Sequence, residues 1–335
     1  MTALEDKIIA EFKDGKASVE RTLLAVSGLE TEEAIYSYQR KLDFIQEDFE
    51  KSCPKRNSDY QNAKSLFDYF WETKPERCND DSLLVKVIDN QLDEDRNKGV
   101  GNCLGLTSLY SILGQRLGLN LSVLVSIEHI LTLLSCSNQE IVVENNNRFG
   151  FDSKLKSEYK KEDLIQLVVS AFNNRGVTKH DLGDLTGALL NYNRAIELKP
   201  DYASAFNNRG NVKYKLGNLN GALLDYNRAI ELEPNYAAAF NNRGVTKHDL
   251  GDLTGALLNY NRAIELKPDY ASAFNNRGNV KYKLGNLNGA LLDYNRALEL
   301  KPDDARAKQN KEWLLEQMKR TETKKPWHKK IFDKR

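Results

Sequence analysis

The spacing of apolar residues changes twice along the chain. Near the start, apolar residues recur every three or four positions, which predicts five helices, at 3–12, 18–29, 31–52, 61–72 and 81–92. A sixth segment, 104–117, predicts an amphipathic helix. Short runs rich in β-branched residues follow and predict strands, the last two as a hairpin, at 120–127, 129–136 and 139–146. We therefore expect an α+β domain, mostly helical with a small antiparallel sheet.

The second half of the chain repeats with a period of 34 residues. Each unit resembles AFNNRGNVKYKLGNLNGALLDYNRAIELEP, residues 205–234. Glycine and alanine stand where two helices must approach closely, and LGNLNG supplies a break between them. A proline then prevents continuation of the second helix. Four prolines close the units at this period, namely Pro200, Pro234, Pro268 and Pro302. Each unit is therefore expected to be a helical hairpin, and stacking of hairpins should supply the core.

These units resemble the tetratricopeptide repeat. One unit carries the residues of that family's signature, Phe206, Gly210, Gly217, Ala222, Tyr226, Ala229 and Pro234. The resemblance implies an all-α, right-handed superhelix over 161–304. The expected units are 169–202, 203–236, 237–270 and 271–304, followed by a capping helix at 305–319 and a basic tail at 320–335. The α+β domain would then occupy residues 1–160.

The array is a duplicated pair of units, because residues 171–229 and 239–297 are identical. A surface that tolerates copying suits a binding groove that grows with length better than a single catalytic pocket. His180 and His248 are copies of one another, which argues against either as a catalytic base.

Asparagines recur on the first helix of each unit, which in this family lines the concave face. An amide offers donors and an acceptor, so a ladder of asparagines at the helix spacing of roughly 8–10 Å could meet an extended peptide about every third residue. We expect the exposed groove positions and therefore the peptide-binding residues to be Asn173, Asn174, Asn207, Asn208, Asn211, Asn241, Asn242, Asn275, Asn276 and Asn279. The lysines and arginine of the family's carboxylate clamp are replaced here by Asn or Ser.

Cys103 raises a second possibility, because it stands directly before the helix predicted at 104–117. A thiol at a helix N-terminus feels the positive end of the helix dipole, which favours the thiolate. His129 begins a predicted strand and is the one histidine of this domain, so it could exchange a proton with the thiol. The simpler alternative is that Cys103 is a small core residue.

The order of helix with cysteine, strand with histidine and strand ending in an acid resembles the transglutaminase-like branch of the cysteine peptidases. GNCLGLTSLYSILGQRLGL, from residue 101, is similar to the nucleophile helix of bacterial members that are joined to tetratricopeptide repeats. The resemblance implies a site of Cys103, His129 and Glu144, with Asp152 as the alternative acid. The Asn102 side chain could add an oxyanion donor.

The composition of the chain limits which classes of partner and cofactor are expected. Lys and Arg number 49 against 48 Asp and Glu, so no global field favours nucleic acid or a membrane. The first residues are mixed in charge and show no secretory signal, which favours a cytoplasmic protein. The four cysteines are far apart, so no metal or disulfide framework is expected, and no cofactor is implied. The expected function is a scaffold that binds an extended peptide or partner protein. The alternative is a thiol peptidase or amide acyltransferase to which the array brings protein substrates.

Overall fold

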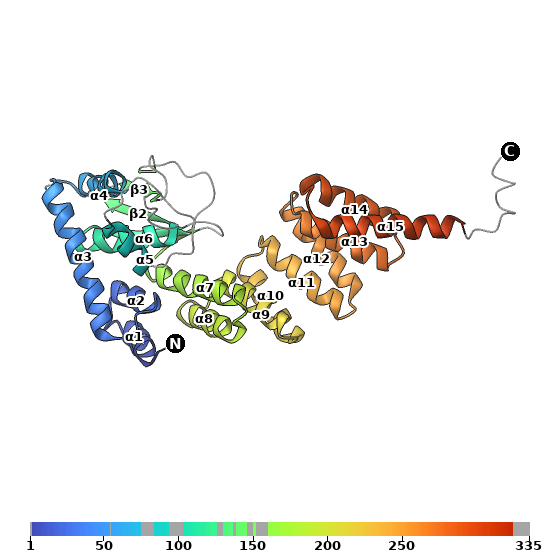
Figure 1. Ribbon diagram of the computed structural model, residues 1–335, viewed down its shortest axis with the longest axis horizontal. Helices are drawn as coiled ribbons and strands as arrows, with labels where there is room; N and C mark the ends of the chain where they lie inside the picture. The colour runs from blue at the N-terminus through green and yellow to red at the C-terminus, as the bar shows by residue number, and fades with distance from the viewer. Residues whose placement is uncertain are drawn as a thin grey trace. The chain divides into compact units, whose positions relative to one another are not determined.

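The computed structural model describes residues 2–53, 55–74, 84–93, 103–125, 130–136, 139–145, 150–151 and 160–323. The chain forms two compact units, Met1–Pro200 and Asp201–Arg335, so the boundary falls after the first repeat (Figure 1). No described helix is long and apolar enough to cross a membrane.

Five helices open the first unit, and side-chain caps fix where four of them begin. The hydroxyl of Thr31, for example, accepts the backbone N–H of Ala34 at 3.1 Å, which satisfies a donor that the first turn leaves open. Thr2, Ser18 and Ser58 do the same for α1, α2 and α4. The helices are α1 (Ala3–Lys13), α2 (Val19–Val26), α3 (Glu32–Ser52), α4 (Asp59–Thr73) and α5 (Leu84–Leu92).

A four-stranded antiparallel sheet follows, in the order β3-β2-β1-β4. Its strands are β1 (Leu121–Val125), β2 (Ile130–Cys136), β3 (Gln139–Val143) and β4 (Lys160–Glu162). The predicted small antiparallel sheet and its β2–β3 hairpin are confirmed, with Cys136 paired to Gln139. The short strand β4 was not expected, and it carries the sheet past residue 160.

Helix α6 (Cys103–Arg116) is buried rather than amphipathic. Every residue from Leu104 to Gly114 is buried, whereas the sequence pattern predicted one polar face. The expected polar face is wrong because its hydroxyls have partners inside the core: Thr107 donates to the Ile130 carbonyl at 3.2 Å, and Ser111 lies 3.4 Å from the Thr132 hydroxyl. Satisfied hydroxyls can be buried at little cost.

Four helical hairpins follow, and their internal packing depends on glycine. In each hairpin a glycine of the first helix faces a tyrosine ring of the second. A Cβ on Gly210 would lie 2.7 Å from Tyr226 Cε1, so no larger residue fits without displacing the ring. Gly217 has a φ of 79° and turns the chain between the helices.

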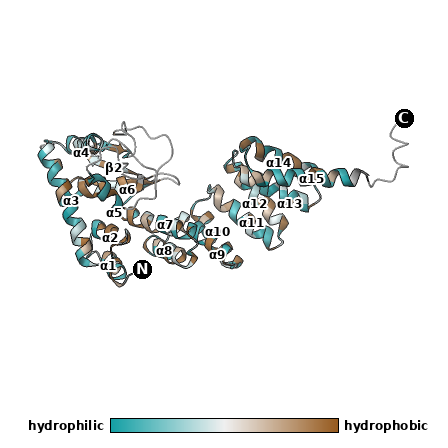
Figure 2. Cartoon of the chain, in the orientation of Figure 1, coloured by the Kyte–Doolittle hydropathy of each residue, from teal (hydrophilic) through white to brown (hydrophobic). Residues whose placement is uncertain are grey.

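The hairpins are named by their order. The first is α7 (Ile165–Asp181) with α8 (Leu185–Leu198), and the second is α9 (Ala203–Lys215) with α10 (Leu219–Leu232). The third is α11 (Ala237–Asp249) with α12 (Leu253–Leu266), and the fourth is α13 (Ala271–Lys283) with α14 (Leu287–Leu300). Figure 2 shows hydrophilic and hydrophobic residues alternating around these helices, as expected for stacked amphipathic elements.

Helix α15 (Ala305–Thr323) covers the last hairpin. Leu314 is fully buried with Tyr294 of α14, and Met318 packs against the same cluster. The Trp313 ring meets Tyr282 edge to face, with centroids 4.7 Å apart. Residues 324–335, most of the predicted basic tail, lie outside the described residues.

Candidate functional site

From the second hairpin onward, asparagines of the first helices form a ladder of hydrogen bonds between neighbouring elements. Asn242 Nδ2 donates to the Oδ1 atoms of Asn207 and Asn211, both at 3.0 Å. The bond to the preceding hairpin recurs from Asn276 to Asn241 at 3.1 Å and from Asn310 to Asn275 at 2.9 Å. The amide suits this place because one group both donates and accepts. The ladder therefore joins successive hairpins as well as lining them.

The expected exposure of the first asparagine in each pair is wrong. Only 4–8% of the surface of these residues is exposed, namely Asn173, Asn207, Asn241 and Asn275. Asn207, Asn241 and Asn275 are buried because each accepts a hydrogen bond from an asparagine of the next element, an interaction that a single repeat unit does not contain. The second asparagines are partly buried and keep some accessible surface, namely Asn174, Asn208, Asn242 and Asn276.

Two further asparagines anchor tyrosines of the second helices. Asn211 Oδ1 accepts the hydroxyl of Tyr226 at 2.9 Å, and Asn279 Oδ1 accepts that of Tyr294 at 2.7 Å. Both asparagines remain partly buried. Each one therefore contributes to the packing of its own hairpin.

A polar cluster lies at the C-terminal ends of α9 and α11. The Tyr214 hydroxyl donates to Asp249 Oδ2, and this bond raises the pKa of Tyr214 to about 12. The other oxygen of Asp249 lies 3.0 Å from His248 Nδ1. Asp249 thus ties two neighbouring first helices together.

An arginine directly follows each asparagine pair and bridges the two helices of its hairpin. In the second hairpin, Arg209 binds Asp225 through two bonds of 2.9 and 2.6 Å, and Lys213 reaches the same carboxylate at 2.8 Å. The fourth hairpin repeats this arrangement with Arg277 and Asp293. In the first and third hairpins the corresponding residue is an asparagine, so the arginine has no acid within its own hairpin.

In the first hairpin, Glu5 of α1 supplies the missing carboxylate. Arg175 Nη2 and Nη1 donate to Glu5 at 2.5 and 2.9 Å, and Nη1 also donates to the Val26 carbonyl at 2.8 Å. The sequence pattern did not predict this pair. Its signal is the alternation of Asn and Asp at the arginine's partner position, which leaves Arg175 without an acid of its own.

The residues expected to form a thiol site are only partly described. Cys103 is the first residue of α6, as expected for a thiol at a helix start. Asn102, His129 and Asp152 lie outside the described residues. Strand alternation places Glu144 on the sheet face of Val142, whereas α6 packs on the opposite face. The structure therefore does not bring Glu144 to the α6 side of the sheet.

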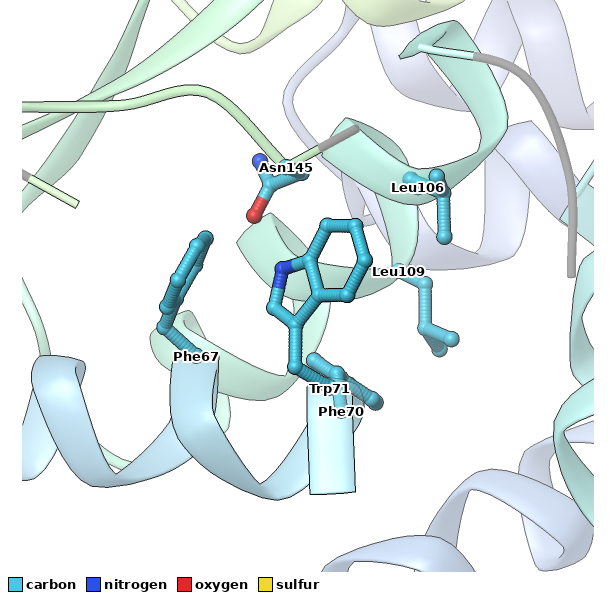
Figure 3. A pocket seen from close by; sticks show the side chains of 6 residues that line it. All are labelled: Phe67, Phe70, Trp71, Leu106, Leu109 and Asn145. Carbon is cyan, nitrogen blue, oxygen red and sulfur yellow. The ribbon is translucent and has the colours of Figure 1, made fainter. Parts of the chain in front are cut away.

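Asn145 reaches α6 instead. Its Nδ2 donates to the Thr132 hydroxyl at 2.9 Å and lies 3.5 Å from the Thr107 hydroxyl. Figure 3 shows Asn145 facing the rings of Phe67 and Trp71 across a small cavity. The cavity measures about 10 Å³, the space of a single water molecule, so it does not hold a substrate.

Several solved structures resemble part of the chain. A crystal structure of MamA protein covers 44% of this chain and 81% of its own, with 24% identity and a TM-score of 0.39. The first TPR of Spaghetti (RPAP3), bound to the HSP90 peptide SRMEEVD, covers 35% of this chain and 92% of its own, with 26% identity and a TM-score of 0.34. No curated protein matches the chain.

Family models match the repeat region directly. The model described as TPR repeat matches residues 176–217, 210–251 and 246–285. The model described as tetratricopeptide repeat matches residues 271–304. These matches coincide with the glycine-tyrosine hairpins described above. Residues 176–304 of the chain are therefore tetratricopeptide repeats.

Proposed function

We propose that the chain is a protein-interaction scaffold, and that the first helices of its repeats bind an extended peptide or an extended segment of a partner protein. The observation that carries the proposal is the row of second asparagines, one per hairpin, each partly accessible. A row of one polar group at a regular spacing suits a ligand that also repeats, and a peptide backbone repeats.

The hydrogen bonds already made indicate what this row can offer. Both N–H groups of Asn242 Nδ2 are engaged, by the Oδ1 atoms of Asn207 and Asn211. Asn242 Oδ1 accepts one bond, from Asn241 at 3.3 Å, and an amide oxygen has two lone pairs. Asn242 therefore offers an acceptor, which would bind a backbone N–H group of the ligand.

Replacement of Asn242 by alanine tests this function. The probe is a set of peptides selected from a random library on the immobilised full chain. We expect Asn242→Ala to weaken these peptides at least tenfold while the helical content is retained. Asn310→Ala is the matched control, because it removes a ladder bond of the same kind, to Asn275, at the end of the array. Equal loss in both variants, or none in Asn242→Ala, would contradict a binding role for the row.

A second function, thiol peptidase or acyltransferase, is favoured by one observation. Cys103 begins α6, and the Ile130 carbonyl accepts a bond from Thr107, one turn further along that helix. The start of β2 therefore lies close to the start of α6. We propose that His129, the residue before Ile130, pairs with the Cys103 thiol, with Asp152 as the orienting acid.

Alkylation of the thiol at graded pH separates the two functions. Pairing predicts that Cys103 reacts with an apparent pKa well below the ordinary value of about 8.5, and that His129→Ala raises it. Cys103→Ala identifies the labelled thiol. If the Cys103 thiol reacts with its ordinary pKa, and this pKa is unchanged in His129→Ala, the thiol-enzyme function is contradicted and the scaffold function remains.

A further inference from the structure

From Ala239 onward the third hairpin repeats the sequence of the first from Ala171 onward, so each side chain from Ala171 to Leu198 has a counterpart in α11–α12. Their internal contacts match. Arg175 donates to Asn191 at 2.6 Å, and Arg243 donates to Asn259 at 2.7 Å. Any difference between the two hairpins is therefore caused by their neighbours.

In the first hairpin, helix α1 docks on α7 and α8 through three charged contacts, one to Arg175 of α7 and two to residues of α8. Glu5 binds Arg175, Asp6 accepts from Arg194, and Lys13 donates to Glu197. Glu5 is almost fully buried there, with 4% of its side chain exposed. Each contact joins opposite charges, so this face of the hairpin is complementary to a helix with two adjacent acids and a lysine two turns later.

The counterpart face on α12 is open. Leu258 is 64% exposed, against 40% for Leu190 of α8. The side chain of Arg262 is 48% exposed, against 25% for Arg194. Glu265 pairs only with Arg262, one turn away, among the described residues. The third hairpin thus presents the docking face of the first without the helix that covers it.

Arg243 lacks the carboxylate that the other three array arginines have. Its Nε and Nη1 atoms donate to two neutral amides, Asn259 at 2.7 Å and Asn227 at 2.8 Å. Within the described part of the chain, no acid lies within ion-pair distance of Arg243 and Nη2 has no partner. The guanidinium also stacks 5.3 Å from the Phe240 ring. Burial lowers the pKa of Arg243, because desolvation disfavours its charged form.

We propose that α12 and Arg243 form a second docking face, whose ligand is a partner protein's helix with the chemistry of α1. A glutamate of that helix binds Arg243, and the acid that follows it binds Arg262. A lysine eight residues after the glutamate, roughly 12 Å at 1.5 Å per residue, binds Glu265. The chain's own α1 is already engaged by Arg175. This face lies mainly on a second helix, so it is separate from the asparagine row.

The probe for this face is a synthetic copy of α1, residues 2–16, held helical by a lactam between Lys7 and Glu11. These residues already form an i,i+4 ion pair on the exposed side of α1, so the bridge leaves the docking side unchanged. A fluorescent form of the peptide is titrated with the full chain, and its anisotropy is measured. We expect saturable binding that weakens as salt is added.

One substitution should prevent peptide binding at this docking face while leaving the packing of the hairpin intact. Asn259→Asp gives Arg243 an acid of its own, as Asp225 and Asp293 do for the second and fourth hairpins. We expect it to weaken the peptide at least tenfold with an unchanged melting temperature or a higher one. The matched control is Arg228→Glu on α10, where the hairpin's arginine is already paired, and we expect less than a twofold effect.

A charge exchange tests direct contact. Arg262→Glu should weaken the peptide at least tenfold, and a peptide with Asp6→Lys should recover most of that loss on this variant alone. Failure of the helical peptide to bind, an unchanged affinity for Asn259→Asp, or an equal loss with Arg228→Glu would each overturn the proposal.

Discussion

The first and third hairpins share one sequence from Ala171 and Ala239 onward but have different surroundings. Arg175 meets the buried carboxylate of Glu5, whereas its copy Arg243 meets two amides. Their second helices differ in the same sense, since α8 is partly covered by α1 and α12 is open. The comparison separates two levels of structure. A repeat's internal geometry follows from its own residues, whereas the charge balance at its edge depends on the neighbouring segment.

The largest effect should come from breaking the Glu5–Arg175 ion pair, which has no counterpart in the third hairpin. Glu5→Gln leaves the Arg175 charge buried without its carboxylate, and we expect unfolding to become easier by about 3 kcal/mol. Urea denaturation of the full chain measures this. The control is Asp6→Asn, whose half-exposed pair with Arg194 should contribute about 1 kcal/mol or less. Equal losses in the two variants would mean that burial of Glu5 is unimportant.

Substitutions inside the hairpin should lower the free energy of unfolding by the same amount in the first and third hairpins. A Cβ on Gly176 would lie 2.6 Å from Tyr192 Cε1, and one on Gly244 would lie 2.8 Å from Tyr260 Cε1. We expect each Gly→Ala variant to lose about 1–3 kcal/mol by overpacking, as measured by urea denaturation. A large difference in stability loss between the two variants would contradict the claim that the two hairpins have the same internal packing.

Loss of an asparagine side chain should have an effect of intermediate size on stability, and this effect should differ between the first and third hairpins. Asn242 makes two bonds to the second hairpin, whereas its copy Asn174 makes no side-chain hydrogen bond among the described residues. Asn242→Ala should therefore cost about 1–2 kcal/mol and Asn174→Ala less than about 0.5 kcal/mol. Thermal unfolding of both variants gives the comparison, and the reverse order would refute it.

The smallest effect concerns pH. The Lys247 ammonium and the Gly255 N–H lower the pKa of Asp252, and the Gly187 N–H and Lys179 lower that of its twin Asp184. Because the folded pKa is lowered, this stabilisation is present above the unfolded pKa of about 3.9 and is lost as pH falls through the folded value. Asn218 shows that asparagine keeps the cap. We expect Asp252→Asn to be slightly less stable than the parent at pH 7 and to match it below pH 3; a gap that persists in acid would contradict this.

The repeats could be predicted from the sequence because each hairpin contains its own signals: a small residue where the helices meet, a break and a closing proline. The helices and the β2–β3 hairpin of the first unit were likewise visible as changes in periodicity. Strand β4 was not, since its three residues are Lys, Lys and Glu and it exists only through pairing with β1.

Features that depend on two distant segments were predicted poorly. The hydroxyls of α6 resemble a polar surface until the partners Ile130 and Thr132 are known. The buried asparagines look like groove residues until a second hairpin is stacked on the first. Glu5 and Arg175 are 170 positions apart, and only the alternation of Asn and Asp hints that the arginine needs an outside acid.

The number of lactam-bridged α1 peptides that bind per chain tests the central claim most directly. Isothermal titration calorimetry of the full chain measures it. The account predicts one site per chain, lost in Asn259→Asp and retained in Arg228→Glu, because only the third hairpin has the docking face uncovered and its arginine without an acid. No binding, or binding to every hairpin alike, would contradict it.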